Sequence, residues 1–513
     1  MSIIKKYFPG IALFLIFLFI GVIHYKDYGP GWDEPIHRLI GNVTYDYIFN
    51  GNMTLKTIEF RNLGTGFELP LIFIEKWCHL TDVRDIYLMR HMVTHIFFLI
   101  GALSFYVLAF RHFEHRSIAS LAFLMLALNP RLYAHSFFNS KDIPFLVSFV
   151  LAFTLWQMAD TKQKKYLFLM TGAACGYATS IRIMGVLLVP CFLVYVLWDI
   201  VNNLNNGTAL KTILLKGLLF LLGFCATLYI CWPILWSNPI FYFKEQFLSL
   251  AHVHWDGEVY FKGNNIPGSK LPISYLPVWL SMTIPEVWLI AGIAGCIAVV
   301  VAFLRKPVPF LTDMSNRNFL LYLMCFAGPL AVVVVLGSVN YDDWRHIYFI
   351  YPSLMMCGLF LIHKLYATAA RSIVYVLCVV QLIMLTTFIV KYHPYQYAYF
   401  NNFVSHKDQY LRNHYDVDYW GIACRDGVKY ILDHDRSDSI KVNATSMIID
   451  NSCLMLSPAD RKRVIITGRR GNPGYYITNF RNNHPEDYRY PEIFYEIKVL
   501  NSTILGVYKV NNK

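Results

Sequence analysis

The sequence YFPGIALFLIFLFIGVIHYKDYGPGWDEPIH, residues 7–37, joins an apolar run to a polar segment that contains two adjacent carboxylates. The run over residues 7–23 is long enough for a helix to cross a bilayer. Asp33 and Glu34 gain nothing from facing lipid at the end of such a helix, so their presence needs another reason. From this stretch alone, a functional site and a solvated acidic loop are equally good interpretations.

The composition excludes an ordinary soluble protein. Of 513 residues, 56% are hydrophobic and only 15% are charged, whereas soluble domains contain about 25% charged residues. Aromatic residues make up 16% of the chain, as in proteins with interfacial belts of Trp and Tyr. The net charge is +12, but Lys and Arg fall mostly in short breaks between apolar runs. A nucleic-acid binder would gather them on one face. We therefore expect a lipid bilayer as a partner and no nucleic acid.

Eleven apolar runs predict the membrane part. They cover residues 7–23, 86–110, 117–129, 143–159, 166–181, 183–200, 213–232, 273–304, 318–337, 346–363 and 372–391. No small-residue cleavage site follows the first run, so we interpret it as an uncleaved helix with a cytoplasmic N-terminus. All five predicted cytoplasmic breaks are then net basic, which agrees with the positive-inside rule. The predicted fold class is a polytopic all-α membrane protein with about 11 transmembrane helices.

The remaining segments are predicted to lie outside the cytoplasm. They are a first outer loop at residues 24–85, a large outer loop at 232–272 and the C-terminal region. Within the first loop, the apolar spacing of residues 34–49 predicts a helix that lies along the membrane interface. We therefore predict a transmembrane catalytic domain at residues 1–392.

Residues 393–513 predict a separate small α/β domain, because their composition becomes polar and no run could span a bilayer. A helix is predicted at residues 426–433, and strands at 439–442, 464–467, 475–480, 493–500 and 503–510. The last two strands predict a hairpin. Cys424 and Cys453, in this polar region, could pair in an oxidising compartment or remain free.

Polar residues gather in six clusters on the predicted outer side. The clusters contain Asp33, Glu34, His37 and Glu68; Arg131, His135, Lys141 and Asp142 within residues 129–142; Arg182; His252 and His254 in the large loop; Arg345 and His346 within residues 340–346; and His393. The cytoplasmic breaks hold only scattered basic residues and a few acids. This asymmetry favours an enzyme with its active site at the outer interface.

The cationic members indicate an anionic ligand. Arg345 presents a planar fork that can grip a phosphate with two hydrogen bonds, whereas Lys141 is a point charge. A carboxylate such as Asp33 suits a general base that takes a proton from an incoming hydroxyl. Together these residues fit transfer from a phosphate-linked donor, in which the cations stabilise the departing phosphate.

Structural interpretations of the same residues stay open. Arg131 and Arg182 could be interfacial residues that extend toward water, and Lys141 with Asp142 could be a local ion pair. Each histidine taken singly is typical of a hydrogen-bonded structural residue; His252 and His254 would share a face only on a strand. No ligand spacing argues for a metal, so we predict no cofactor, with a divalent metal as the alternative.

Several ordered motifs resemble one family. They are GWDE at residues 31–34, NPR at 129–131, NSKDIP at 139–144, LPISYLPVW at 271–279, DWRH at 343–346, HPYQYAYFN at 393–401 and DYWG at 418–421. Together with the many spans and the C-terminal domain, they resemble the GT-C membrane glycosyltransferases. The resemblance is greatest to the protein O-mannosyltransferase and aminoarabinose transferase-like group, which is phospholipid-carrier-dependent and glycosyltransferase family 39-like.

The resemblance implies that a sugar passes from a polyprenyl-phosphate donor to an acceptor protein, lipid A or surface glycan, with inversion at the anomeric carbon. Asp33 would act as a base or orient the acceptor, with its neighbour Glu34 as a second catalytic carboxylate. Lys141 and Asp142 would lie near the donor, and Arg345 would contact the carrier phosphate. The remaining substrate-binding candidates are Glu68, Arg131, His135, Arg182, His346 and His393. Relatives with monophosphate carriers generally need no metal. Unlike many relatives, the first loop lacks His-Pro-Pro after the acid, and residues 68–70 stand roughly where it would be expected.

The resemblance also implies a multi-pass protein of the bacterial inner membrane, with the C-terminal domain in the periplasm. One alternative function is a transporter or flippase for lipid-linked sugars. Such a protein should carry charges along a path through the membrane, whereas the charges here lie at one end of the spans. Another alternative is a non-catalytic envelope assembly factor whose C-terminal domain binds a partner.

Overall fold

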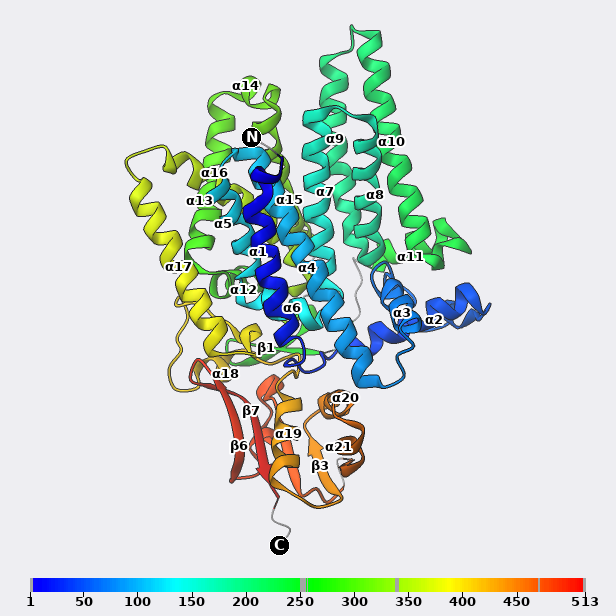
Figure 1. Ribbon diagram of the computed structural model, residues 1–513, viewed down its shortest axis with the longest axis vertical. Helices are drawn as coiled ribbons and strands as arrows, with labels where there is room; N and C mark the ends of the chain where they lie inside the picture. The colour runs from blue at the N-terminus through cyan, green and yellow to red at the C-terminus, as the bar shows by residue number, and fades with distance from the viewer. Residues whose placement is uncertain (1–2, 250–254, 256, 337–340, 469–470, 511–513) are drawn as a thin grey trace.

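The computed structural model describes residues 3–249, 255, 257–336, 341–468 and 471–510 (Figure 1). His252 and His254 therefore lie outside the described residues. Within the described part, nine helices are long and apolar enough to cross a membrane, or ten if the bent pair α5 and α6 counts as one span. The chain is thus a multi-pass membrane protein.

The long helices follow the predicted apolar runs. They are α1 (Ile3–His24), α4 (Val83–Phe113), α7 (Asp142–Lys162), α9 (Leu188–Asn202), α10 (Gly207–Cys231), α13 (Glu286–Arg305), α15 (Met314–Leu336), α16 (Tyr351–Tyr366) and α17 (Arg371–Lys391). The remaining predicted run that forms one unbroken helix is α8 (Lys165–Ile181). It packs closely on α10, because a Cβ atom at Gly172 would meet the carbonyl oxygen of Phe220 at 1.9 Å. Such small residues let helix backbones approach within a membrane.

Proline ends one predicted span and breaks another. The run at 117–129 forms α5 (Arg116–Ala127), which bends by 60° into α6 (Pro130–Phe138). The run at 273–304 forms α12 (Tyr275–Thr283) and α13, with the extended residue Ile284 before Pro285 between them. Proline pushes the residue before it out of the helical region, so an unbroken helix was the wrong expectation here.

Short elements surround the outer ends of the long helices. They include α2 (Glu34–Phe49), α3 (Glu68–Trp77), α11 (Pro239–Ser249), the antiparallel pair β1 (Glu258–Phe261) and β2 (Asn264–Pro267), and the 3-10 turn η5 (Arg345–Ile350). The helix predicted at residues 34–49 is present as α2, and its position along the membrane interface stays a prediction. The helices α2 and α3 project sideways from the bundle (Figure 1). They expose Leu39, Phe49, Phe73 and Trp77, which suits contact with a membrane surface.

A five-stranded mixed sheet with the order β4-β3-β5-β7-β6 forms the C-terminal part. Its elements are α18 (Tyr410–His414), α19 (Cys424–His434), β3 (Ile440–Ala444), α20 (Ile448–Leu454), α21 (Pro458–Arg463), β4 (Val464–Ile466), β5 (Tyr475–Thr478), β6 (Ile493–Val499) and β7 (Ser502–Lys509). The predicted hairpin is present as the antiparallel pair β6–β7, and it turns at Leu500 and Asn501, both with positive φ. Cys424 and Cys453 are free.

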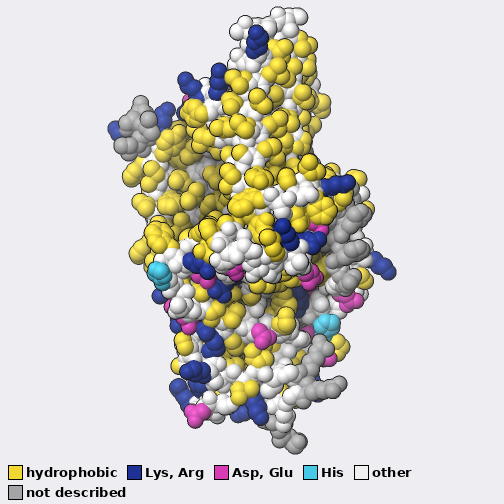
Figure 2. All heavy atoms as spheres, turned by 90° about the vertical axis from the view of Figure 1, so that its right-hand side faces the viewer, with side chains coloured by type: hydrophobic (Ala, Val, Ile, Leu, Met, Phe, Trp, Pro, Cys, Tyr) yellow, Lys and Arg dark blue, Asp and Glu magenta, His cyan; other side chains and the backbone are white. Residues whose placement is uncertain are grey.

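The C-terminal sheet lies at the end of the bundle opposite the N-terminus (Figure 1). Arg425 of α19 joins it to the segment that follows α1, because its Nη1 donates to the carbonyls of Lys26 and Tyr28 at 2.8 Å. On the face drawn in Figure 2, hydrophobic side chains cover the helical part, and most of the charged side chains gather over the lower part. Lys and Arg appear again toward the opposite end. This distribution matches a bilayer around the helices.

Candidate active site

Asp33 lies where the membrane part meets the C-terminal part. The segment after α1 folds back tightly, since the N–H of Gly31 donates to Glu34 Oε2 at 2.7 Å. Small residues are required here because a Cβ atom at Gly29 would meet the carbonyl oxygen of Ile422 at 2.4 Å. The C-terminal part therefore packs directly against the backbone that presents Asp33.

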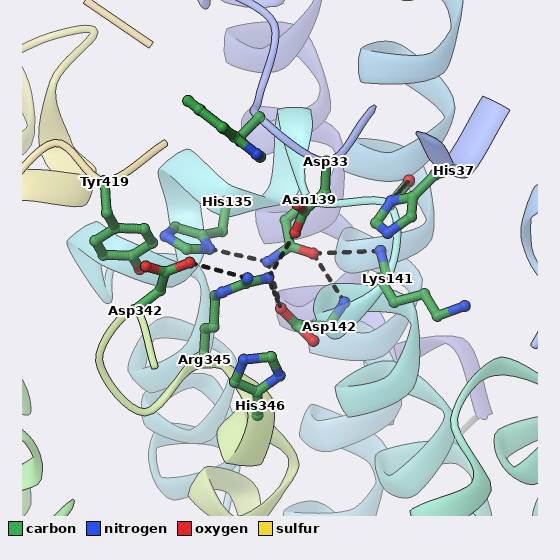
Figure 3. Close-up of polar contacts among 12 residues, drawn as sticks. Asp33, His37, His135, Asn139, Lys141, Asp142, Asp342, Arg345, His346 and Tyr419 are labelled. Atoms are coloured by element: carbon green, nitrogen blue, oxygen red, sulfur yellow. Dashed lines mark hydrogen bonds and ion pairs between the residues drawn. The ribbon is translucent and has the colours of Figure 1, made fainter. Parts of the chain in front are cut away.

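Arg345 occupies the centre of the site (Figure 3). Its Nη1 donates to Asp33 Oδ2 at 2.9 Å and its Nη2 to Asp342 Oδ2 at 3.0 Å, while Nη1 lies 3.6 Å from Asp142 Oδ2. The guanidinium lies over the ring of Trp420, 4.7 Å from the ring centroid. Burial and three carboxylates thus fix this cation in one place.

Asp142 is fixed by the turn that begins α7. Asn139 Oδ1 accepts from the N–H of Asp142 at 2.8 Å, and Asn139 Nδ2 donates to Asp142 Oδ2 at 2.9 Å and contacts His135 Nδ1 at 3.1 Å. Asp142 also forms an ion pair with Arg182. Arg182 Nη1 in turn lies 3.4 Å from His346 Nδ1. The structure therefore brings Asp33, Asp142, Arg182, Arg345 and His346 together, with His135 at the edge.

Lys141 lies beside this group, but its amine points away from Arg345 (Figure 3). Its Nζ donates to the carbonyl oxygen of Gly64 at 2.6 Å. Burial, and to a smaller extent the nearby cation of Arg182, lower the pKa of Lys141 to about 7. Lys141 is therefore poised to change charge near neutral pH.

Glu34 and Glu68 are buried behind Asp33. Glu34 Oε2 contacts His91 Nε2 at 3.2 Å, while Glu68 forms an ion pair with Arg90 and accepts from Ser140 Oγ at 2.6 Å. His37 lies 3.3 Å from the same Ser140 hydroxyl, and burial lowers its pKa to about 3, so the ring is neutral. These contacts hold α2 and α3 against α4.

Arg131 is built into the protein rather than turned toward the Arg345 group. Its Nη1 forms an ion pair with Asp343 Oδ2 at 2.5 Å, and its Nε donates to the carbonyl oxygen of Tyr399 at 2.9 Å. Asp343 also accepts from the hydroxyl of Tyr419 at 2.7 Å. Burial raises the pKa of Asp343 to about 6.

His393 belongs to a separate cluster at the outer end of α1. Its Nε2 lies 2.8 Å from Asp27 Oδ2, and His24 Nδ1 lies 2.9 Å from the same oxygen. Among the described residues, these three form the group whose geometry could hold a metal ion. However, Gln396 Nε2 donates to His393 Nδ1 at 2.9 Å, which leaves the ring proton on Nε2. A metal-binding histidine instead donates through its other nitrogen, so the contacts favour hydrogen bonding.

A cavity of about 500 Å³ opens in front of Asp33 and Arg345. Sequence reasoning missed several of its residues, because the C-terminal part supplies them and no motif marks them. Arg481 is an example: its Nη2 donates to Asp342 Oδ1 at 3.0 Å, and its guanidinium lies over the ring of Trp32. The other lining residues are Ile36, Phe60, Trp255, Tyr341, Thr445, Ser446, Asn479, Asn482 and His484.

Exposure separates the carboxylates of the site. The Asp33 side chain is 25% exposed, whereas that of Asp142 is 1% exposed and both oxygens of Asp342 bind arginines. Buried nitrogens also lack hydrogen-bond partners in the described part of the chain: Nε of Arg345, Nε of Arg182 and Nε2 of His346. Such atoms are ready donors for a bound anion.

Residues 65–238 match the model of a family described as dolichyl-phosphate-mannose-protein mannosyltransferase. This match includes Glu68, Arg131, Lys141, Asp142 and Arg182. It confirms the resemblance that the sequence motifs predicted, and it supports glycosyl transfer from a polyprenyl-phosphate carrier as the reaction class. No curated protein matches the sequence.

Solved structures with a similar arrangement have low sequence identity to the chain. ArnT from Cupriavidus metallidurans bound to undecaprenyl phosphate is 10% identical, with a TM-score of 0.48 over 99% of this chain and 98% of ArnT. The archaeal oligosaccharyltransferase AglB from Archaeoglobus fulgidus, in complex with an inhibitory peptide and a dolichol-phosphate, is 11% identical. Its TM-score is 0.45 over 93% of this chain and 70% of AglB.

Proposed function

We propose that this protein transfers a sugar from a polyprenyl-phosphate carrier to an acceptor on the outer face of the inner membrane, with inversion at the anomeric carbon. The observation that carries the proposal is the pair Asp33–Arg345 on the wall of the cavity, with a carboxylate and a cation at 2.9 Å. The family match over residues 65–238 supports the same reaction class.

Asp33 is the proposed general base. Arg345 holds Oδ2, and Oδ1 has no hydrogen-bond partner among the described residues, so it is free to accept a proton from the acceptor. The deprotonating acceptor oxygen attacks the anomeric carbon as the bond to the phosphate oxygen breaks, and the electron pair leaves with the carrier phosphate. A single displacement from the opposite face inverts the carbon. A positioned base typically contributes about 10²–10⁴-fold to the rate.

Arg345, Arg182 and His346 are the proposed contacts of the carrier phosphate. Their partnerless nitrogens suit the negative charge that grows on the leaving phosphate. Lys141 and Asp142 complete this side of the site, with Asp142 orienting Arg182. We assign Glu34 and Glu68 to holding the segment that carries Asp33, and Arg131, His135 and His393 to supporting roles around the site.

We further propose that residues 1–392 form the catalytic membrane domain and that residues 393–513 form a periplasmic domain that closes the cavity. Arg481 and Asn479 on the cavity wall support this division. The five predicted cytoplasmic segments between apolar runs are net basic, which supports a cytoplasmic N-terminus. The acceptor is a protein, lipid A or a surface glycan.

The proposal is tested by comparing Asp33→Asn with Asp46→Asn in a strain that lacks the native protein. Asp46 lies on α2, and in the described structure its side chain accepts a hydrogen bond only from Asn50, so its variant is a matched control. Carrier-linked sugar should accumulate in the deletion strain and serve as the donor for the purified protein. We expect Asp33→Asn to lose at least about 100-fold of the transfer rate and Asp46→Asn to keep it. Full transfer by Asp33→Asn would refute the assignment of the base, and no accumulating carrier would refute the proposed reaction.

A further inference from the structure

A second, smaller cavity of about 90 Å³ lies away from Asp33, where the membrane part and the C-terminal part meet. Three regions contribute to it: the segment after α1, the first turns of α4, and the C-terminal helices α19 and α21 with the segment between α20 and α21. The lining residues are Lys26, Arg84, Leu88, Arg425, Lys429, Met455, Leu456, Ser457 and Asp460. None of them lines the cavity at Asp33.

Positive charge dominates this second cavity. Lys26, Arg84, Arg425 and Lys429 face a single lining carboxylate, Asp460. Asp460 Oδ2 already accepts from the hydroxyl of Ser457 at 2.7 Å.

The neighbouring acids are committed to other cations. Asp426 pairs with Arg425 at 2.9 Å, and Asp82 lies 3.6 Å from Arg461. Within the described part of the chain, the side chains of Arg84 and Lys429 form no hydrogen bond or ion pair.

The uncompensated charges come from opposite sides of a junction. Lys26 and Arg84 belong to the membrane part, and Lys429 belongs to α19 of the C-terminal part. Like charges repel across such a contact, and a bound anion would turn the repulsion into attraction to both sides. Leu88 and Met455, both buried, supply an apolar floor that limits the water around the anion.

The position of the cavity indicates which kind of molecule carries the anion. On α1, the exposed apolar residues Phe19, Val22 and Ile23 lie in the last turns, on a side that suits contact with lipid, and Lys26 follows three positions after Ile23. Arg84 lies at the same end of the bundle, in the first turn of α4. A phospholipid whose chains lie along α1 would therefore place its phosphate at Lys26 and Arg84.

We propose that this cavity binds the phosphate of an anionic phospholipid and that the lipid fastens the C-terminal part to the membrane part. The chemistry it recognises is a phosphate anion, which a lipid headgroup or free inorganic phosphate could supply. Lys26, Arg84 and Lys429 are the contacting cations. The proposal does not depend on the transferase reaction.

The test measures thermal unfolding of the full-length protein in detergent, before and after addition of phosphatidylglycerol, phosphatidylcholine or inorganic phosphate. The test variant is Arg84→Gln/Lys429→Gln. The control variant is Lys391→Gln/Lys407→Gln, which removes two exposed cations outside the cavity. Lys391 lies over the ring of Tyr392 much as Lys26 lies over the ring of Tyr25.

We expect phosphatidylglycerol to raise the unfolding temperature of the native protein and the control, and phosphatidylcholine to raise it much less. The test variant should lose most of this shift, and its apparent affinity for the anionic lipid should fall about fivefold for each cation removed. A shift with phosphatidylglycerol but not with inorganic phosphate supports the lipid site, whereas an equal shift with inorganic phosphate overturns the assignment to a lipid. The proposal is overturned if neither ligand shifts the native protein, or if all three proteins respond equally.

Discussion

Arg345 Nη1 donates to Asp33 Oδ2 at 2.9 Å, although the two residues are 312 positions apart in the chain. The same guanidinium also binds Asp342, and its Nε has no partner in the described part of the chain. One arginine therefore holds the proposed base, lines the cavity and keeps a buried donor without a partner in the described part of the chain. Because Arg345 has two roles, we expect changes at Arg345 and changes at its neighbours to have different effects.

Arg345→Lys should impair catalysis even though the charge is kept. A lysine ammonium is a point charge on a flexible stem and cannot hold Asp33 and Asp342 with the geometry of a planar fork. We expect the transfer rate at saturating donor to fall about 100-fold, since misplacing a catalytic group costs that much. The measurement is kcat and KM for the carrier-linked donor. Arg371→Lys is the control, because Arg371 lies outside the site at the start of α17 and in the described structure its side chain contacts only Tyr366. A native kcat for Arg345→Lys would contradict the double role.

Glu34→Gln should affect folding more than chemistry. The change removes the charge that faces His91 and weakens the bond from Gly31, both in a fully buried place. A buried group left without its proper partner costs about 1–3 kcal/mol. We expect a lower unfolding temperature but near-native turnover per folded molecule, the reverse of Asp33→Asn. Loss of turnover without loss of stability would instead support a catalytic role for Glu34.

The charge of Lys141 should make donor binding depend on pH. Its pKa in the folded protein is lowered to about 7, so the amine is neutral above that pH while the unfolded chain still binds the proton. Stability therefore rises with pH between about 7 and 10.5, because the unfolded state binds more protons in that window. Donor affinity should change in the opposite sense and weaken as the pH rises from 6 to 8, since the cation is lost.

Lys141→Arg tests this directly, because arginine stays charged over the whole range. We expect KM for the donor to become nearly independent of pH between 6 and 8. The native protein is measured in parallel in the same buffers. A pH dependence that survives unchanged in Lys141→Arg would assign the titration to another group.

Asp343→Asn should destabilise the protein strongly. Arg131 is 1% exposed and lies over the rings of Trp279 and Phe400, so removal of its carboxylate partner leaves a buried charge unpaired. Breaking such a pair costs about 3–5 kcal/mol. Thermal unfolding of Asp343→Asn, of Arg131→Gln and of the double variant measures how strongly the two residues depend on each other for stability. The double variant should lose less than the sum of the single variants, and simple additivity would contradict the ion pair's role.

The membrane part could be predicted from the sequence because its signals are local. Apolar run length decides a spanning helix, and the spacing of apolar residues alone predicted α2 at residues 34–49. The hairpin β6–β7 was likewise predicted from alternating patterns. The break at Pro285 was missed because hydropathy rates a kinked run and a straight run alike.

Only the tertiary structure separated the roles of adjacent residues. Asp33 and Glu34 are neighbours in the sequence, yet one carboxylate lines a cavity and the other is buried against α4. Neighbouring side chains at a helix start point in different directions, and what each meets depends on elements far along the chain. Arg345 and Arg481 reach the site from 312 and 448 positions away from Asp33, and His393 was predicted there but lies with Asp27 instead. Local patterns in the chain were enough to predict that acids and cations gather at one end of a helical membrane protein. Which of them meet was decided by packing, because long-range contacts leave no periodic trace in the chain.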